Sequence, residues 1–164
     1  MLKQSPGDAC LVIAAGITLD QALKAVPKLE ALGIKVRLMD PFTIKPIDKE
    51  AILKHAAECN GKVLVVEDHY SEVKRKHNAA GAILSFLLKY VPCNNLNNNL
   101  SYILLQGGIG DAVLDAVAET RNILVKKMCV KEVPRSGPPM VLLEKYGIGT
   151  DCIVKTVQEF SKVA

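Results

Sequence analysis

The sequence predicts an α/β protein in which helices cover both faces of a mostly parallel β-sheet, giving three layers. The chain has 164 residues, of which 49% are hydrophobic but only 4% aromatic, with no Trp. A core of aliphatic side chains is typical of parallel strands buried between helices. Short apolar runs also alternate with helical patterns from residue 9 to residue 67, the order expected for right-handed crossovers in a parallel sheet. A chain of this length forms one domain, residues 1–164.

Three strands are expected in the first half of the chain. Residues 9–16 form a continuous apolar run, residues 62–67 contain a shorter one, and residues 35–40 form a short segment that Pro41 ends. Short runs without polar alternation indicate strands that are buried on both faces. Each run is also too short for a helix of ordinary length, so we expect strands rather than helices at these places.

Two helices are expected between these strands. Apolar residues recur at helical spacing from 18 to 32, with Thr18 as the expected N-cap and Gly33 just beyond the C-terminal end. Pro27 lies inside this pattern and predicts a kink or a split, because proline lacks the N–H that an interior helical position needs. Asp48 is the expected N-cap of the second helix.

The second half of the chain resumes a regular pattern only after residue 106. A helix is expected after the glycine-rich residues 107–110, followed by a strand over residues 124–130 that we expect to be broken at Lys126 and Lys127. Helical patterns over about residues 141–146 and 151–162 complete the chain.

Charge and cysteine usage exclude several classes of protein. The net charge of +4 is spread along the chain rather than gathered in one stripe, so we expect no nucleic-acid partner. No apolar run approaches the length of about 18 residues that spans a bilayer, so we expect no membrane partner. The five cysteines include no C-x-x-C pair, which indicates reduced thiols and a cytoplasmic location.

Four motifs carry a family resemblance. They are DPFTIKPID at residues 40–48, VEDHY at 66–70, GGIGDAV at 107–113 and VPRSG at 133–137. In this order they resemble motifs of the C-terminal domain of transketolase, particularly the animal type. The resemblance implies the three-layer fold of that domain. It also implies that an edge strand should precede residue 9. Residues 1–8 are short and turn-rich, so we expect this edge strand to be missing and Met1 to mark the start of a truncated or mis-assigned chain.

The resemblance also implies a function for the parent enzyme. Transketolases transfer two-carbon ketol units between sugar phosphates in the pentose phosphate pathway, with thiamine diphosphate as the carbanion stabiliser. In that family the cofactor and its Mg²⁺ are held by upstream domains, so we expect no catalytic, cofactor-binding or metal-binding residue in this chain. The expected partners are those upstream catalytic domains, in the same polypeptide, or a homodimer partner. The resemblance thus favours a structural domain that is not catalytic alone.

Residues 73–106 depart from the family pattern. They begin with a basic cluster, are rich in Asn toward their end, and separate Glu72 from Gly107, which are adjacent in the family. A translated intron or splice variant would explain this atypical insertion, and a lineage-specific loop is the alternative. Long loops without structure are uncommon in compact domains. We expect the chain to unfold at a lower urea concentration than a variant that joins Glu72 to Gly107. An equal or higher midpoint would indicate a true structural element.

A second function hypothesis makes the chain a free-standing regulatory module that binds a small anion. His69 follows the third strand, and open α/β sheets bind ligands at the carboxyl ends of their strands. Gly108 and Gly110 precede a helix whose backbone N–H groups could face an anion. Arg135 and Ser136 add a guanidinium and a hydroxyl. The structural alternatives are a His hydrogen-bonded at the sheet edge or against a neighbouring domain, a tight strand-to-helix turn, and a rigid turn whose Arg pairs with an acidic residue across a domain interface.

Overall fold

The computed structural model describes residues 1–70 and 108–162 of the chain, so the insertion at residues 73–106 lies outside the described residues. Strands and helices follow one another along the chain in the predicted order. They are β1 (Leu11–Ala14), α1 (Ile17–Ala31), β2 (Arg37–Met39), α2 (Lys49–Ala57), β3 (Lys62–Tyr70), α4 (Ile109–Val117), β4 (Leu124–Val130), α5 (Pro139–Lys145) and α6 (Thr150–Ser161).

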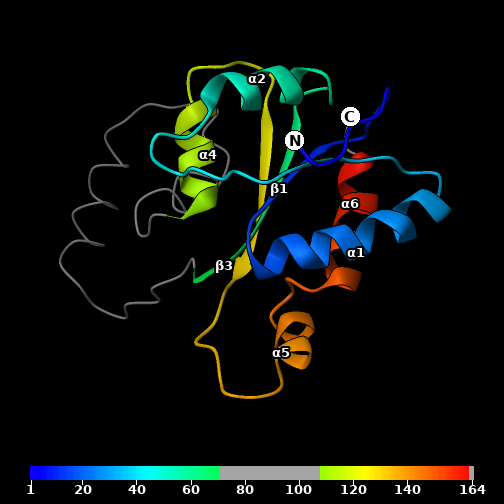
Figure 1. Ribbon diagram of the computed structural model, residues 1–164, viewed down its shortest axis with the longest axis vertical. Helices are drawn as coiled ribbons and strands as arrows, with labels where there is room; N and C mark the ends of the chain where they lie inside the picture. Colours follow the sequence, from blue (N-terminus) through cyan, green and yellow to red (C-terminus); the bar gives the residue numbers. More distant parts are fainter. Residues whose placement is uncertain (71–107, 163–164) are drawn as a thin grey trace, which may run out of the picture.

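The four strands form one parallel sheet in the order β2-β1-β3-β4. Val12 of β1 lies opposite Leu38 of β2 and Leu64 of β3, and Val66 of β3 lies opposite Met128 of β4. In Figure 1, α4 lies on one side of the strands, and α1 and α6 lie together on the other. The expected three-layer α/β/α fold with a mostly parallel sheet is therefore confirmed.

Alternate residues of the central strands divide the core between the two faces of the sheet, as the period of two along a strand requires. On one face, Val12 and Leu64 pack in a cluster with residues of α1 and α6, including Leu29 and Phe160. On the other face, Leu11, Ile13, Val63 and Val65 pack with Ile52 of α2 and with Val113 and Val117 of α4. Both faces are thus closed by helices, which is why the strands are apolar throughout.

Helix α1 differs from its prediction at Thr18, and of the kink or split predicted at Pro27 the split is contradicted. Thr18 is not the N-cap, which is Gly16; Thr18 lies inside the first turn and its Oγ1 donates to the carbonyls of Ala15 and Val66, each at 2.9 Å. Pro27 does not split the helix. The carbonyl that lacks a partner belongs to Leu23, which lies on the exposed side of the helix where water can bind it.

Strand β4 is continuous through Lys126 and Lys127, so the predicted break is wrong. The two side chains point to opposite faces of the sheet. The Nζ of Lys126 lies 5.9 Å from the centre of the Phe160 ring, and the Nζ of Lys127 forms ion pairs with carboxylates at the other face. Charged residues fit within this strand because each has its own partner.

The predicted N-cap of α2 is confirmed, since the N–H of Ala51 donates to Oδ1 of Asp48 at 3.0 Å. At the outer edge of the sheet, residues 1–8 form no strand, but Lys3 makes an isolated antiparallel bridge with Leu38 of β2. Residues near Lys3 therefore cover part of the outer edge of β2, the edge at which the family resemblance implies a further strand. None of the described helices is long and apolar enough to cross a membrane.

Candidate functional site

The carboxyl end of β3 holds a carboxylate inside the protein. Glu67 is only 2% exposed, and its Oε2 accepts a hydrogen bond from the backbone N–H of Gly110 at 3.1 Å. Gly110 lies in the first turn of α4, so the carboxylate faces the positive end of that helix dipole. A carboxylate in such a position is stabilised both by the N–H and by the dipole.

The neighbouring strand supplies a cation to the same place. Lys127 of β4 places its Nζ 3.4 Å from Oε1 of Glu67 and 2.7 Å from Oδ1 of Asp111. Burial alone would lower the pKa of Lys127, but the hydrogen bond to Asp111 and the charges of both carboxylates raise it above its ordinary value. The three side chains therefore form one cluster joined by ion pairs, which we call the Glu67 cluster.

Gly108 and Gly110 lie so close to the Glu67 cluster that neither position has room for a side chain. A Cβ atom built on Gly108 would lie 2.5 Å from Oε2 of Glu67 and 3.2 Å from Cδ2 of His69. A Cβ on Gly110 would lie 2.7 Å from Cδ of Lys127 and 2.9 Å from Oε1 of Glu67. The glycine-rich sequence before α4 thus allows the helix to approach the buried carboxylate.

The structure brings together three of the residues predicted for an anion site. His69, Gly108 and Gly110 lie around Glu67, and Nε2 of His69 is buried without a hydrogen-bond partner among the described residues. However, the helix N–H that was expected to face an external anion is bound by Glu67. An added anion would also lie close to Asp111, so the local charges do not favour it.

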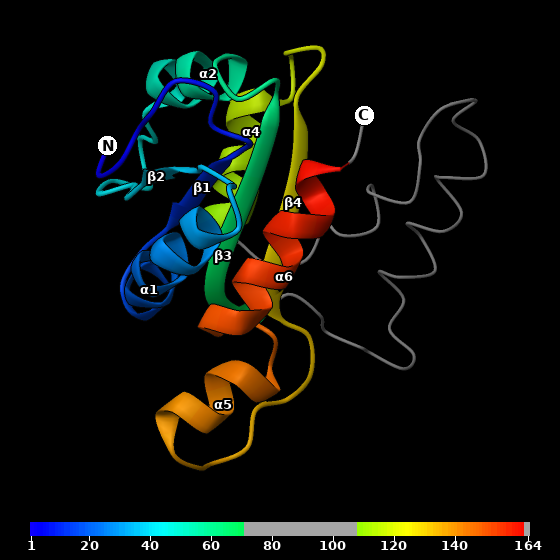
Figure 2. The same ribbon diagram turned by 90° about the vertical axis from the view of Figure 1, so that its right-hand side faces the viewer.

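The other two predicted residues lie elsewhere. Arg135 and Ser136 are exposed in the segment that joins β4 to α5, which projects away from the sheet (Figure 2). The backbone N–H of Arg135 donates to Oη of Tyr146 at 2.7 Å. Within the described residues, no hydrogen bond or ion pair joins either residue to the Glu67 cluster. Binding of an anion by any of the five residues stays a prediction.

A cavity of about 260 Å³ lies beside the carboxyl ends of β3 and β4, where open sheets commonly bind ligands. Its lining is mostly apolar, and Asp68 is the only charged side chain among the described residues that line it. The other lining residues come from α1, the end of β4, α5 and the loops around α5: Ile17, Val130, Pro134, Pro139, Leu142, Leu143, Tyr146 and Ile148. An apolar cavity with one acidic group suits an apolar side chain better than a phosphate.

A second buried charge network lies at the amino end of the sheet, and the sequence analysis missed it. Arg37 of β2 is 5% exposed; its Nε donates to Oδ2 of Asp8 at 3.2 Å, and Nη1 contacts Nδ1 of His55 at 2.8 Å and the carboxylate of Glu58. Asp8 also accepts from the N–H of Ser5 at 2.8 Å. An arginine inside an apolar strand was the signal, because a buried guanidinium requires acidic partners.

The thiols near this network are unreactive. Burial raises the pKa of Cys10 to about 12 and that of Cys59 to about 11. Thiolates are the reactive form, so neither cysteine acts as a nucleophile at neutral pH. The described cysteines are free thiols, and the described residues contain no group of three or more His, Cys, Asp or Glu side chains that could hold a metal ion.

The network around Arg37 predicts a loss of stability in acid. Burial and the charge of Arg37 lower the pKa of His55 below 6.5, and the hydrogen bond with Arg37 lowers that of Glu58 below 4.5. The unfolded chain therefore binds protons that the folded chain excludes, so stability is lost as pH falls below about 6.5 and again below about 4.5. We expect a lower urea midpoint at pH 5.5 than at pH 7.5.

The control for this pH effect is His55→Asn, which keeps an acceptor for Arg37 but does not titrate. Its urea midpoint should change less between pH 7.5 and pH 5.5 than that of the unmodified chain. Equal changes in the two proteins would contradict the role given to His55.

The family is decided by a match over more than half of the chain: the family model described as "Transketolase, C-terminal domain" matches residues 1–93. The chain belongs to the transketolase C-terminal domain family. Transketolase from Mus musculus and from Homo sapiens is each 37% identical over 158 residues, or 96% of this chain. Transketolase-like protein 1 from Bos taurus is 34% identical over a similar length.

This transketolase C-terminal domain chain is much shorter than the full-length relatives that it matches. It spans about a fifth of their length, 20% for the mouse and human proteins. A solved structure titled "Split gene transketolase, inactive beta4 tetramer" superposes with a TM-score of 0.68 and 27% identity over 98% of this chain and 44% of that one. The resemblance that the four motifs predicted is thus confirmed.

Proposed function

We propose that the chain serves as the C-terminal structural domain of a transketolase, which supports the catalytic domains and contributes to the enzyme's homodimer. The observation that carries the proposal is the match to nearly all of this chain but only 20% of the mouse relative. The parent enzyme would transfer two-carbon ketol units between sugar phosphates of the pentose phosphate pathway, in the cytoplasm, where free thiols such as Cys10 and Cys59 persist.

The cavity at the carboxyl ends of β3 and β4 does not fit thiamine diphosphate or its Mg²⁺. The cavity at the strand ends is apolar and its charged residue, Asp68, is acidic, whereas a diphosphate requires cations or free N–H groups. The N–H at the start of α4 is occupied by Glu67. We therefore derive no catalytic step from these residues; the cofactor would bind in other domains of the parent enzyme.

The proposal is tested by three measurements on the purified chain. We expect no transfer of a ketol unit from xylulose 5-phosphate to ribose 5-phosphate, no binding of thiamine diphosphate with Mg²⁺ by calorimetry, and self-association in sedimentation velocity. Self-association is expected because large hydrophobic side chains such as Val133, Met140 and Val141 are more than half exposed. Micromolar binding of the cofactor would refute the structural role.

A small-anion-binding regulatory module remains the second candidate, and the unpartnered Nε2 of His69 is the observation that favours it. A titration with inorganic phosphate, followed by NMR, tests this hypothesis directly. Saturable shifts at His69, Gly108 and Gly110 would support it, and shifts at Arg135 and Ser136 alone would indicate a separate surface site. No shift at millimolar phosphate would exclude the module.

A further inference from the structure

Phe42 is the most exposed of the large hydrophobic side chains in the described part of the chain, at 97%. Single exposed hydrophobic residues are common on protein surfaces. Phe42 differs because its loop is held at several points: its N–H donates to the carbonyl of Asp40 at 3.1 Å, and Ile44 and Ile47 form a β-bridge. An aromatic side chain presented to solvent by an ordered loop is typical of an interface anchor.

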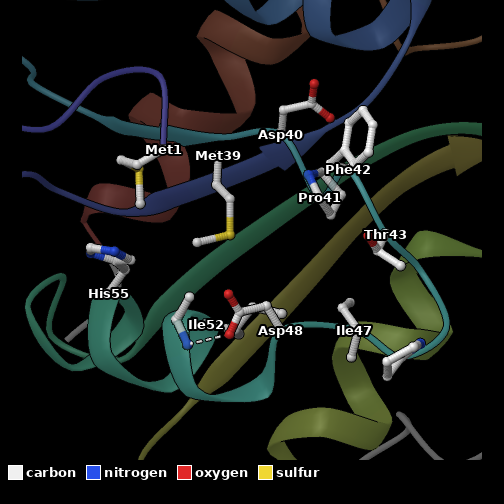
Figure 3. Close-up of a pocket in the computed structure, with 12 residues that line it drawn as sticks. Met1, Met39, Asp40, Pro41, Phe42, Thr43, Ile47, Asp48, Ile52 and His55 are labelled. Atoms are coloured by element: carbon white, nitrogen blue, oxygen red, sulfur yellow. Dashed lines mark hydrogen bonds between the residues drawn. The ribbon is translucent and has the colours of Figure 1, made fainter.

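A cavity of about 400 Å³ lies beside Phe42. Figure 3 shows Met39 and Ile52 directed into this space, with Met1 and His55 on one side of the view and Phe42 and Thr43 on the other. The remaining lining residues belong to the same loop and to α2: Asp40, Pro41, Pro46, Ile47, Asp48 and Ala51. Its floor is apolar, since Met39 and Ile52 are core residues of the sheet and of α2.

The first residues of the chain lead to this cavity. The N–H of Leu2 donates to the carbonyl of Leu38 at 2.9 Å, so residues 1–3 run along the outer edge of β2, and Met1 lines the cavity. The family model describes this domain as C-terminal, so in the full-length relatives polypeptide precedes it. A preceding segment that followed the same path would enter the domain beside Phe42.

We infer that Phe42 and this cavity, which together we call the Phe42 surface, dock an apolar surface of the polypeptide that precedes this domain in transketolases. The inference rests on the proposed structural function and names the face through which the domain performs it. The path of the chain favours this occupant over a second copy, because only a preceding segment is brought to this cavity by covalent connection, which raises its effective concentration.

The test uses the purified 164-residue chain and, as its probe, mouse transketolase from which the matching C-terminal fifth has been removed. Binding is measured by calorimetry at neutral pH. We expect Phe42→Ala to weaken binding at least tenfold, a loss of about 1.4 kcal/mol, because truncating an anchor residue removes a large share of the binding energy. Phe42→Leu should retain most of the affinity. The control is Leu124→Ala, which removes an exposed apolar side chain at the opposite, amino-terminal end of the sheet.

The outcomes separate this inference from the proposed function. Binding by the unmodified chain that Phe42→Ala leaves intact would overturn the Phe42 surface but retain the structural role. No binding by the unmodified chain would overturn both. Self-association of the chain that Phe42→Ala abolishes, without binding to the probe, would assign the surface to a second copy and overturn the occupant named here. Phe42→Ala should not change the urea midpoint, since the side chain contacts little of its own fold.

Discussion

Arg37→Met is expected to lower the free energy of unfolding by about 3–5 kcal/mol, the range for removing one partner of a buried ion pair. Methionine fills the volume of the arginine stem but carries no charge, so most of the expected loss is electrostatic. Asp8 is 1% exposed and would keep the N–H of Ser5 as a hydrogen-bond donor but lose its cation. Burying that carboxylate without its cation is the main cause of the expected loss.

Urea unfolding at pH 7.5 measures this effect, and Lys28→Met is the matched control. Lys28 pairs with Asp151 at 2.6 Å on the surface, where both side chains are more than half exposed, so its replacement should cost less than about 1 kcal/mol. The double variant Asp8→Asn with Arg37→Met should recover stability, because Asn still accepts from Ser5 but carries no charge. A midpoint for Arg37→Met equal to that of the control would contradict the prediction.

The sequence predicted the order of elements and the parallel sheet because both depend on local patterns. The apolar runs at residues 9–16 and 62–67 are long enough to indicate strands buried on both faces, and Asp48 is followed by a helical pattern. The error at Thr18 and the absence of a split at Pro27 both have causes outside the local sequence. Thr18 bonds to Val66, which is distant in sequence, and Pro27 is tolerated because the affected carbonyl faces water.

The charge clusters could not be predicted because their members meet only through strand register. Lys126 and Lys127 suggested a break in a strand, yet the register of β4 against β3 places Lys127 beside Glu67. The same holds for Arg37, whose partner Asp8 comes from the segment before β1. A tight turn was one alternative proposed for the glycines before α4, and the buried carboxylate that Gly108 and Gly110 approach was not anticipated.

The anchoring role of Glu67 leads to the second large effect. Glu67→Ala is expected to lower the free energy of unfolding by about 3–5 kcal/mol. The change removes the acceptor for the N–H of Gly110, one of the two carboxylates that pair with Lys127, and the volume of a buried side chain. Because Glu67 joins β3 to the start of α4, we expect the loss of exchange protection to be largest at α4 and β4 in hydrogen-exchange measurements.

Two variants separate the causes of this loss. Glu67→Gln keeps an acceptor for Gly110 but removes the charge, so it should cost less than Glu67→Ala. Lys127→Met leaves the carboxylates of Glu67 and Asp111 close together without a cation and should be destabilising, and Glu67→Gln in that background should restore part of the loss. The control variant for Glu67→Ala is Glu159→Ala. The exposed carboxylate of Glu159 lies 4.0 Å from Nζ of Lys126 and should contribute little to stability. If Glu67→Ala were no more destabilising than this control, the Glu67 cluster would not hold α4 to the sheet, and the presence of glycine at positions 108 and 110 would need another explanation.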